Sequence, residues 1–113
     1  MSDTCLFCRI LRGEIPSTQV AESEGAIAFR DVNPQAPTHV LVIPRDHVAS
    51  LSAAGDQAML GEVLSLAAAV AKAEGLDADG YRVVINNGRN AGQAVDHLHL
   101  HVLGGRKLTW PPG

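Results

Sequence analysis

The segment His97–Leu103 reads HLHLHVL and alternates imidazole with aliphatic side chains. Successive side chains of a β-strand point to opposite faces of the sheet, so this alternation predicts a strand, which we extend to Val95–Leu103. Its histidines, His97, His99 and His101, are expected on one face, about 7 Å apart at neighbouring steps. The aliphatic side chains are expected on the opposite face, against the core: Leu98, Leu100 and Val102.

Further elements are predicted from hydrophobic periodicity and from glycine, proline and polar breakers. The glycine-bearing segment Asn87–Gln93 and the proline-containing segment Asp31–Pro37 are expected to be loops, since proline disrupts a central strand. Five strands and two helices predict an α+β fold with a largely antiparallel sheet. We expect helices over Thr4–Arg12 and Asp56–Glu74, and the other strands over Gln19–Glu22, Ala26–Phe29, His39–Ile43 and Tyr81–Asn86.

The composition limits the classes of function. The chain has 113 residues, 46% of them apolar, and its 9 basic and 12 acidic residues give a net charge of −3. This length predicts one domain over residues 1–113. The mild acidity disfavours binding to a nucleic-acid polymer or an anionic membrane, so a bound phosphate must be held by local donors. No apolar run reaches the roughly 20 residues of a membrane span and no secretory signal is visible, so we expect a cytoplasmic protein.

The histidine alternation has three interpretations. The rings are buried and satisfied by hydrogen bonds, or they ligate the metal of a hydrolase, or one of them is a nucleophile. Metal hydrolases with strand-end histidines are barrels of ~250 residues, which disfavours the second interpretation. A neutral imidazole attacks phosphorus well, and neighbouring imidazoles hold phosphate oxygens and transfer protons near neutral pH. The loop Asn87–Gln93 enters the same strand, and its backbone N–H groups and Gln93 are suited to holding a phosphate.

The segment matches the His-φ-His-φ-His-φ-φ signature, where φ is apolar, of the histidine-triad superfamily. Residues 31–39, DVNPQAPTH, and residues 110–113, WPPG, resemble its Hint branch, the histidine-triad nucleotide-binding proteins; the resemblance spans roughly Cys5 to Gly113. It implies an α+β homodimer whose five-stranded sheets join into one ten-stranded sheet. It also implies hydrolysis of purine nucleoside phosphoramidates, of AMP-amine or AMP-lysine type, to an amine and a nucleoside monophosphate, with no cofactor required for catalysis.

The resemblance assigns catalytic roles to four histidines. His99 would attack the α-phosphorus and become transiently nucleotidylated, and His101 would contact the phosphate oxygens and hand on protons. His97 and His39 would form a buried hydrogen-bonded chain behind the nucleophile. The strand pattern agrees on one point, since it places His99 between two other imidazoles.

The nucleotide contacts follow from the same resemblance. Asp31 matches a residue that binds the ribose hydroxyls, because a carboxylate accepts two donors; its alternative role is to cap the turn that follows it. Phe7, Ile10 and Phe29 would shape the base pocket, or else belong to the ordinary core. Trp110 resembles a tail residue that reaches the partner's active site. The remaining contacts implied are Val32, Asn33, Asn86, Gly92, Gln93 and Ala94.

Ala94 departs from the branch, which often has a serine at this position, after the Gly-Gln pair, that donates a hydrogen bond near the leaving amine. The nucleophile and its flanking histidines are intact, so we expect hydrolysis to survive with an altered rate and leaving-group preference. The departure also keeps a second hypothesis open: a nucleotide-binding adaptor for AMP-like ligands, with little or no turnover.

The two cysteines, Cys5 and Cys8, are too few for a disulfide framework in the expected compartment. A thioredoxin-type redox pair would follow a strand, and too few residues precede Cys5 to form one. Either both are reduced thiols on the first helix, or they are half of a structural zinc site that needs two more ligands. His47 and His97 match the further ligands in some bacterial histidine-triad proteins. We therefore predict a structural zinc on these four residues, which leaves His99 free of metal.

Overall fold

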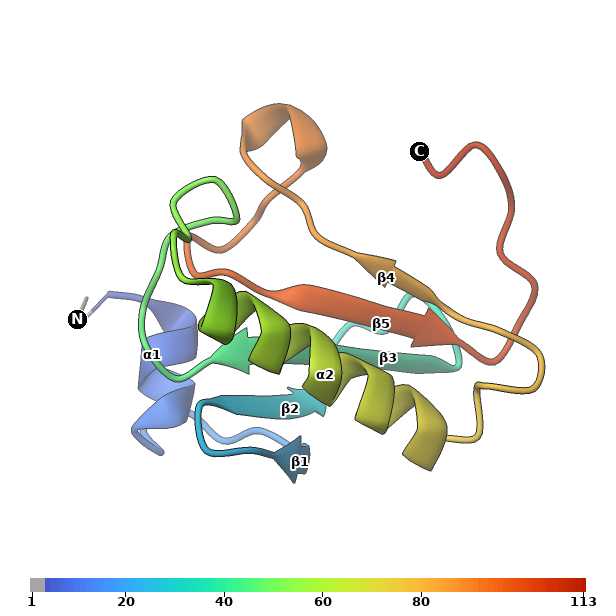
Figure 1. The fold of residues 1–113 in the computed structure, drawn as a ribbon, viewed down its shortest axis with the longest axis horizontal. Coiled ribbons are helices and arrows are strands. Elements are labelled where there is room, and N and C mark those ends of the chain that lie inside the picture. Colours follow the sequence, from blue (N-terminus) through green and yellow to red (C-terminus); the bar gives the residue numbers. More distant parts are fainter. Residues whose placement is uncertain (1–3) are drawn as a thin grey trace.

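Five strands form one antiparallel sheet in the computed structural model, which describes residues 4–113 (Figure 1). Residues 1–3, on which the expectation about a secretory signal partly rests, lie outside the described residues. The strand order is β1-β2-β3-β5-β4 and every neighbouring pair is antiparallel, which confirms the predicted α+β class. The elements are α1 (Leu6–Leu11), β1 (Gln19–Glu22), β2 (Ala26–Arg30), β3 (Thr38–Pro44), α2 (Gln57–Ala73), β4 (Arg82–Val84), the 3₁₀ turn η1 (Arg89–Ala91) and β5 (Leu100–Gly104).

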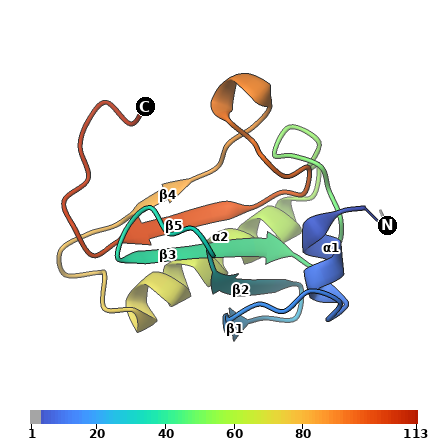
Figure 2. The same cartoon turned by 180° about the vertical axis from the view of Figure 1, so that it is seen from behind.

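The two faces of the sheet carry separate apolar clusters, because side chains alternate along each strand. In β3, Val40 and Val42 pack under α2, whereas Leu41 and Ile43 belong to the cluster that contains residues of α1. Figures 1 and 2 show α2 running across one face of the sheet and α1 at one end of the other. Because α1 is short, it covers only part of its face.

Helix α2 begins after Asp56, whose side chain accepts hydrogen bonds from the backbone N–H groups of Ala58 and Met59, at 2.9 and 3.3 Å. Such a cap satisfies amide groups that the first helical turn leaves unpaired. Gly75 follows the helix with a φ of +76°, a conformation that favours glycine, so the helix ends where the sequence predicts. Among the described helices, none combines the length and hydropathy that crossing a bilayer requires.

The last strand is shorter than predicted, since β5 begins at Leu100 and not at Val95. Continuing the register between β3 and β5 beyond the pair of Val42 and Leu100 would place Pro44 opposite Leu98, two residues further on. Proline has no N–H to donate, and the Leu98 N–H instead donates to the Val48 carbonyl oxygen at 2.7 Å. The aliphatic side chains of this segment still pack under α2, as the alternation predicts: Leu98, Leu100 and Val102.

Strand β4 is also shorter than the predicted Tyr81–Asn86. Its pairing with β5 ends at Val84, opposite His101. Continuing that register would place Asn86 opposite His99, which precedes β5, so no strand partner exists there. The early start predicted for β5 and the late end predicted for β4 are therefore one error, caused by the same missing pairing.

Candidate functional site

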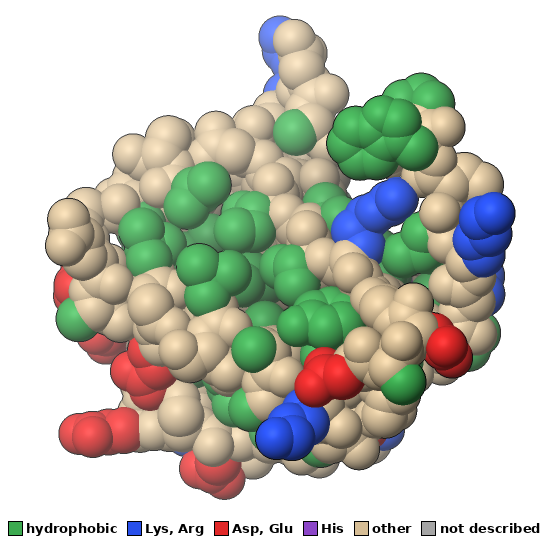
Figure 3. Space-filling view, turned by 45° about the vertical axis from the view of Figure 1, so that its right-hand side comes forward, with side chains coloured by type: hydrophobic (Ala, Val, Ile, Leu, Met, Phe, Trp, Pro, Cys, Tyr) green, Lys and Arg blue, Asp and Glu red, His purple; other side chains and the backbone are tan. Residues whose placement is uncertain are grey.

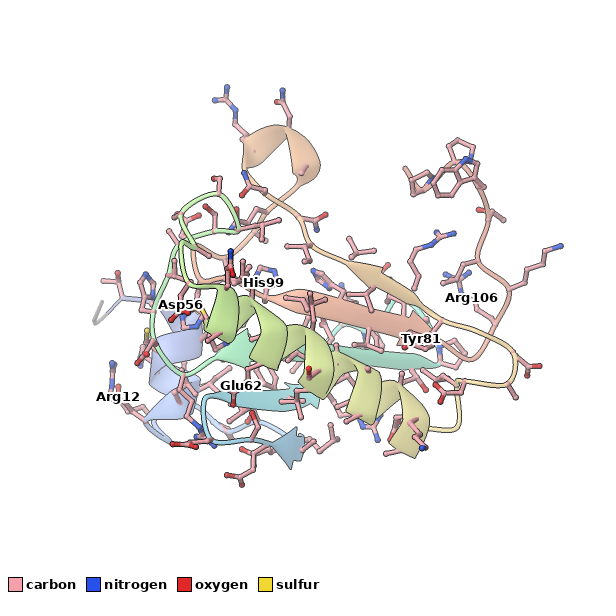
Figure 4. The ribbon with its side chains drawn as sticks, viewed as in Figure 1. Arg12, Asp56, Glu62, Tyr81, His99 and Arg106 are labelled. Atoms are coloured by element: carbon pink, nitrogen blue, oxygen red, sulfur yellow. The ribbon has the colours of Figure 1, made fainter. Side chains whose placement is uncertain are left out.

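A cavity of about 310 Å³ is lined by residues of α1, β2 and β3 and by the segment that carries the histidines. Most of its lining side chains are apolar, and the polar ones include His99 and His101. Figure 4 shows His99 near the start of β5. The residues predicted from the sequence that line this cavity are Phe7, Ile10, Phe29, Asp31, Val32, Ala94, His99 and His101.

Other walls of the cavity come from residues that the sequence pattern does not indicate. The segment Ile15–Ser17 carries only a proline as a signal, and a proline indicates a break in the chain, not a wall. Leu41 and Val95 lie in apolar runs, where no local feature distinguishes a lining residue from a core residue. The lining residues missed in this way are Leu6, Ile15, Pro16, Ser17, Arg30, Leu41 and Val95.

The ring of His99 is held in one tautomer. Its Nδ1 lies 2.7 Å from the carbonyl oxygen of His97. Because a carbonyl oxygen only accepts hydrogen bonds, Nδ1 carries the proton and Nε2 of the neutral ring keeps a free lone pair. His99 is 5% exposed, and its ring meets Phe7 edge to face with centroids 5.2 Å apart. These contacts give the ring one orientation, with its lone pair on the nitrogen not bonded to the backbone.

His101 has the opposite polarity, as a chain of hydrogen bonds shows. The backbone N–H of Gln35 donates to His39 Nδ1 at 3.0 Å, so a neutral His39 carries its proton on Nε2. That Nε2 lies 2.9 Å from His101 Nδ1 and donates to it. His101 therefore carries its proton on Nε2, a buried nitrogen with no hydrogen-bond partner among the residues described. Since His101 also lines the cavity, this N–H is the donor it can offer to a ligand.

Burial keeps this chain of rings neutral. Burial, with smaller contributions from the neighbouring His99 and His39, lowers the pKa of His101 from 6.5 to about 4. Burial also lowers the pKa of His39, although the Asp31 carboxylate, 3.4 Å from its Nε2, acts in the opposite direction. Both rings are therefore uncharged near pH 7, which the assignment of donors and acceptors requires.

The ring of His97 does not join the hydrogen-bonded chain of His39 and His101, and the catalytic role expected for His97 behind the nucleophile stays a prediction. Its Nε2 donates to the Pro44 carbonyl oxygen at 2.9 Å, and its Nδ1 faces two cysteine sulfurs. His97 supports His99 through its main-chain carbonyl alone. Alternation places the His97 ring on the same side of the sheet as His99, since both rings meet Phe7, but the nitrogens of His97 are engaged by Pro44 and the cysteines.

Asp31 caps the turn that follows it and also lines the cavity. Its Oδ1 accepts the backbone N–H of Asn33 at 2.8 Å, which is the turn-capping role. The same residue lines the cavity, as does Val32, which is 97% exposed. Asn33 is not among the residues that line the cavity.

The amide of Gln93 is engaged within the protein. Its Oε1 accepts the backbone N–H of Gly88 at 2.8 Å, and its Nε2 donates to the carbonyl oxygens of Ala49 and Val95, at 2.7 and 3.0 Å. These bonds close the loop on itself and tie it to the segment after β3. A direct contact of this side chain with phosphate thus stays a prediction, and one that competes with three internal hydrogen bonds.

Three further residues predicted to contact the nucleotide, Asn86, Gly92 and Trp110, are not among the lining residues of this cavity. Trp110 is 79% exposed, and its ring lies 5.9 Å from the guanidinium carbon of Arg82. Within one chain the tail therefore packs beside β4 and not at the cavity, and its predicted contact with a partner's site stays a prediction.

Cys5, Cys8, His47 and His97 each bring one ligand atom to within 4.8 Å of the others. The Nδ1 atoms of His47 and His97 are 3.2 Å apart, and Cys8 Sγ lies 3.3 Å from the first and 3.6 Å from the second. A tetrahedral zinc ion with ordinary bond lengths has edges of about 3.3 Å between nitrogens and about 3.6 Å between nitrogen and sulfur. The residues present therefore fit a zinc ion in donor type and in spacing.

Comparisons with known proteins agree with this fold. The HIT domain profile matches residues 12–108. The chain is 53% identical over 112 residues to a 14 kDa zinc-binding protein of Zea mays, covering 96% of this chain and 87% of the relative. It superposes on a HIT family hydrolase from Legionella pneumophila Philadelphia 1 with a TM-score of 0.94 and 51% identity, covering 97% of this chain and 100% of the other. A histidine triad nucleotide-binding protein from Candida albicans gives a TM-score of 0.84 at 37% identity, over 96% of this chain and 83% of that one. The chain belongs to the HIT domain family.

Proposed function

We propose that the protein hydrolyses the P–N bond of purine nucleoside phosphoramidates through a nucleotidyl-histidine intermediate on His99. One observation carries this proposal: two adjacent rings of opposite polarity line one cavity, with a lone pair on His99 Nε2 and a proton on His101 Nε2. A nucleophile beside a hydrogen-bond donor is the arrangement that attack on phosphorus needs. Relatives described as a hydrolase and as a nucleotide-binding protein support the same class of chemistry.

The rest of the cavity suits a nucleotide. The side chains of Phe7, Ile10 and Phe29 offer an apolar surface for a purine base. Asp31 Oδ1 is used by the turn, which leaves Oδ2, beside His39, to accept a ribose hydroxyl. In this arrangement the base lies against α1 and the α-phosphorus lies at the histidines.

The reaction then proceeds in two steps. In the first, His99 Nε2 bonds to phosphorus and the P–N bond breaks, while His101 Nε2–H donates a hydrogen bond to the phosphoryl oxygens and the departing amine takes a proton from solvent. In the second, water attacks phosphorus and the bond to His99 Nε2 breaks, which releases a nucleoside monophosphate, the neutral ring and one proton to solvent. His39 holds His101 in the required tautomer throughout.

We further propose that Cys5, Cys8, His47 and His97 hold a structural zinc ion and that the protein is a homodimer. The name of the maize relative supports the first proposal. The second is supported by β4, which lies at the edge of the sheet with one side unpaired, since such an edge is a template for pairing with another chain. Hydrophobic side chains also gather on the side of the molecule seen in Figure 3.

The proposed activity is tested with an adenosine phosphoramidate and two proteins, the wild type and His99→Ala. We expect turnover by the wild type only, with AMP bound by both proteins, because the base and ribose contacts do not involve the His99 ring. Equal turnover by the variant would contradict the mechanism. Binding of AMP by the wild type without turnover would instead favour an adaptor, the hypothesis that Ala94 keeps open.

A further inference from the structure

His97 belongs to two groups of contacts at once. Its ring is 0% exposed, and Nε2 donates to the Pro44 carbonyl oxygen at 2.9 Å, so the lone pair lies on Nδ1. That Nδ1 lies 3.4 Å from Cys5 Sγ, 3.6 Å from Cys8 Sγ and 3.2 Å from His47 Nδ1. The Pro44 contact thus selects the tautomer that presents a ligand atom to the cysteines.

The main chain of the same residue holds the nucleophile. The His97 carbonyl oxygen accepts from His99 Nδ1 at 2.7 Å, and this bond places the free lone pair on Nε2. The carbonyl lies outside β5, so the sheet ladder does not hold it. The neighbouring Leu98 N–H donates to Val48 on one side. On the other side, the ring of His97 holds this carbonyl in place, and the position of the ring depends on its contacts with Cys5, Cys8 and His47.

We propose that Cys5, Cys8 and His47, with the metal they hold, act as positioning residues for the nucleophile, because they fix His97 and through its carbonyl fix the tautomer and direction of the His99 ring. The cluster would then contribute to turnover as well as to folding. This inference rests on the proposed function for its kinetic consequence, but not for its structural one.

His47 is the ligand best suited to a test. It is exposed and lies in the segment after β3, whereas Cys8 is 0% exposed, so truncating His47 leaves no buried cavity. His47→Ala removes one of the four ligands. His47→Cys keeps a zinc ligand at the same place and is the rescue variant. Asp46→Ala, at the exposed neighbouring residue, is a matched control outside the cluster.

The first readout is the tautomer of His99, measured by long-range ¹⁵N–¹H correlation on zinc-loaded wild type and on each variant, without substrate. We expect a single Nδ1–H form in the wild type, Asp46→Ala and His47→Cys, and a mixture of tautomers in His47→Ala. A single tautomer in His47→Ala, with metal analysis showing its zinc lost, would overturn the proposal. This measurement needs no turnover, so failure of the proposed activity leaves its outcome interpretable.

The second readout is steady-state turnover of an adenosine phosphoramidate. Loss of a residue that supports a ligand of a metal site typically lowers metal affinity or activity roughly 10-fold to 100-fold, and His47 supports His97 in this way, so we expect kcat of His47→Ala to fall within that range. We expect KM and AMP affinity to stay near the wild-type values, since His47 is not among the residues that line the nucleotide cavity. Recovery of kcat in His47→Cys supports positioning. A parallel loss of kcat, AMP affinity and melting temperature in both His47 variants would indicate a structural role only and overturn the proposal.

Discussion

His39 joins a backbone amide to the ring that faces the substrate, so replacing it tests the hydrogen-bond chain of the site. His39→Leu removes the donor to His101 Nδ1 and the acceptor for the Gln35 N–H, at a residue that is 5% exposed. Gln35 is exposed, so water can satisfy its amide, and the main cost is one buried nitrogen left unpaired. That cost is roughly 1–3 kcal/mol, by which we expect the free energy of unfolding to fall.

The same change should slow catalysis, because His101 is no longer held in one orientation. If one hydrogen bond of about 1.4 kcal/mol is lost in the transition state, kcat falls about tenfold. His39→Gln is the matched control, since its amide oxygen can accept from Gln35 and its amide nitrogen can donate to His101, in the polarity of the original ring.

The assays are urea unfolding and steady-state turnover of an adenosine phosphoramidate by the wild type and both variants. We expect His39→Gln to recover most of the stability and rate that His39→Leu loses. If the two variants are equally impaired, or if His39→Leu turns over at the wild-type rate, the reasoning from donor and acceptor polarity is wrong.

Three further predictions concern pH, metal and assembly. The free energy of unfolding should fall as pH is lowered from about 6.5 toward about 4, because His101 of the unfolded chain takes up a proton in that window and the folded ring does not; a urea series that is flat across this window would contradict the burial of the ring. Metal analysis of protein purified without chelator should find about one zinc per chain, and none after Cys5→Ala, whereas zinc retained by that variant would exclude the site. Light scattering should give about twice the chain mass of 11.9 kDa, and a mass near 11.9 kDa would exclude the homodimer.

The sequence predicts the sheet well because the evidence for it is local. The alternation in His97–Leu103 is enough to predict which side chains enter the core. The start of β5 is different, since the pairing with β3 ends at Val42 and Leu100, before the register would reach Pro44, and this tertiary relation is contained in no window of sequence. Alternation does predict the side of the sheet on which the His97 ring lies, but its hydrogen-bond partners, the Pro44 carbonyl oxygen and the cysteine sulfurs, come from residues far away in the chain.

The candidate site also has some features that the sequence shows and others that only the folded structure shows. The histidines, the pair of cysteines and part of the cavity lining are visible in the sequence as patterns and spacings. The partners of individual polar atoms are not, as Gln93 shows: its loop composition indicates phosphate binding, while its amide bonds to Gly88, Ala49 and Val95. Residues far apart in the chain form these bonds, so only the folded structure can assign them.

The central claim is that the lone pair of His99 Nε2 forms a covalent bond to phosphorus. Rapid mixing of the wild type with an adenosine phosphoramidate, an alkaline quench and mass spectrometry of the digested protein test it directly. We predict a nucleotidyl adduct on His99 that appears and decays during turnover. Turnover without an adduct, or an adduct on another residue, would contradict the account.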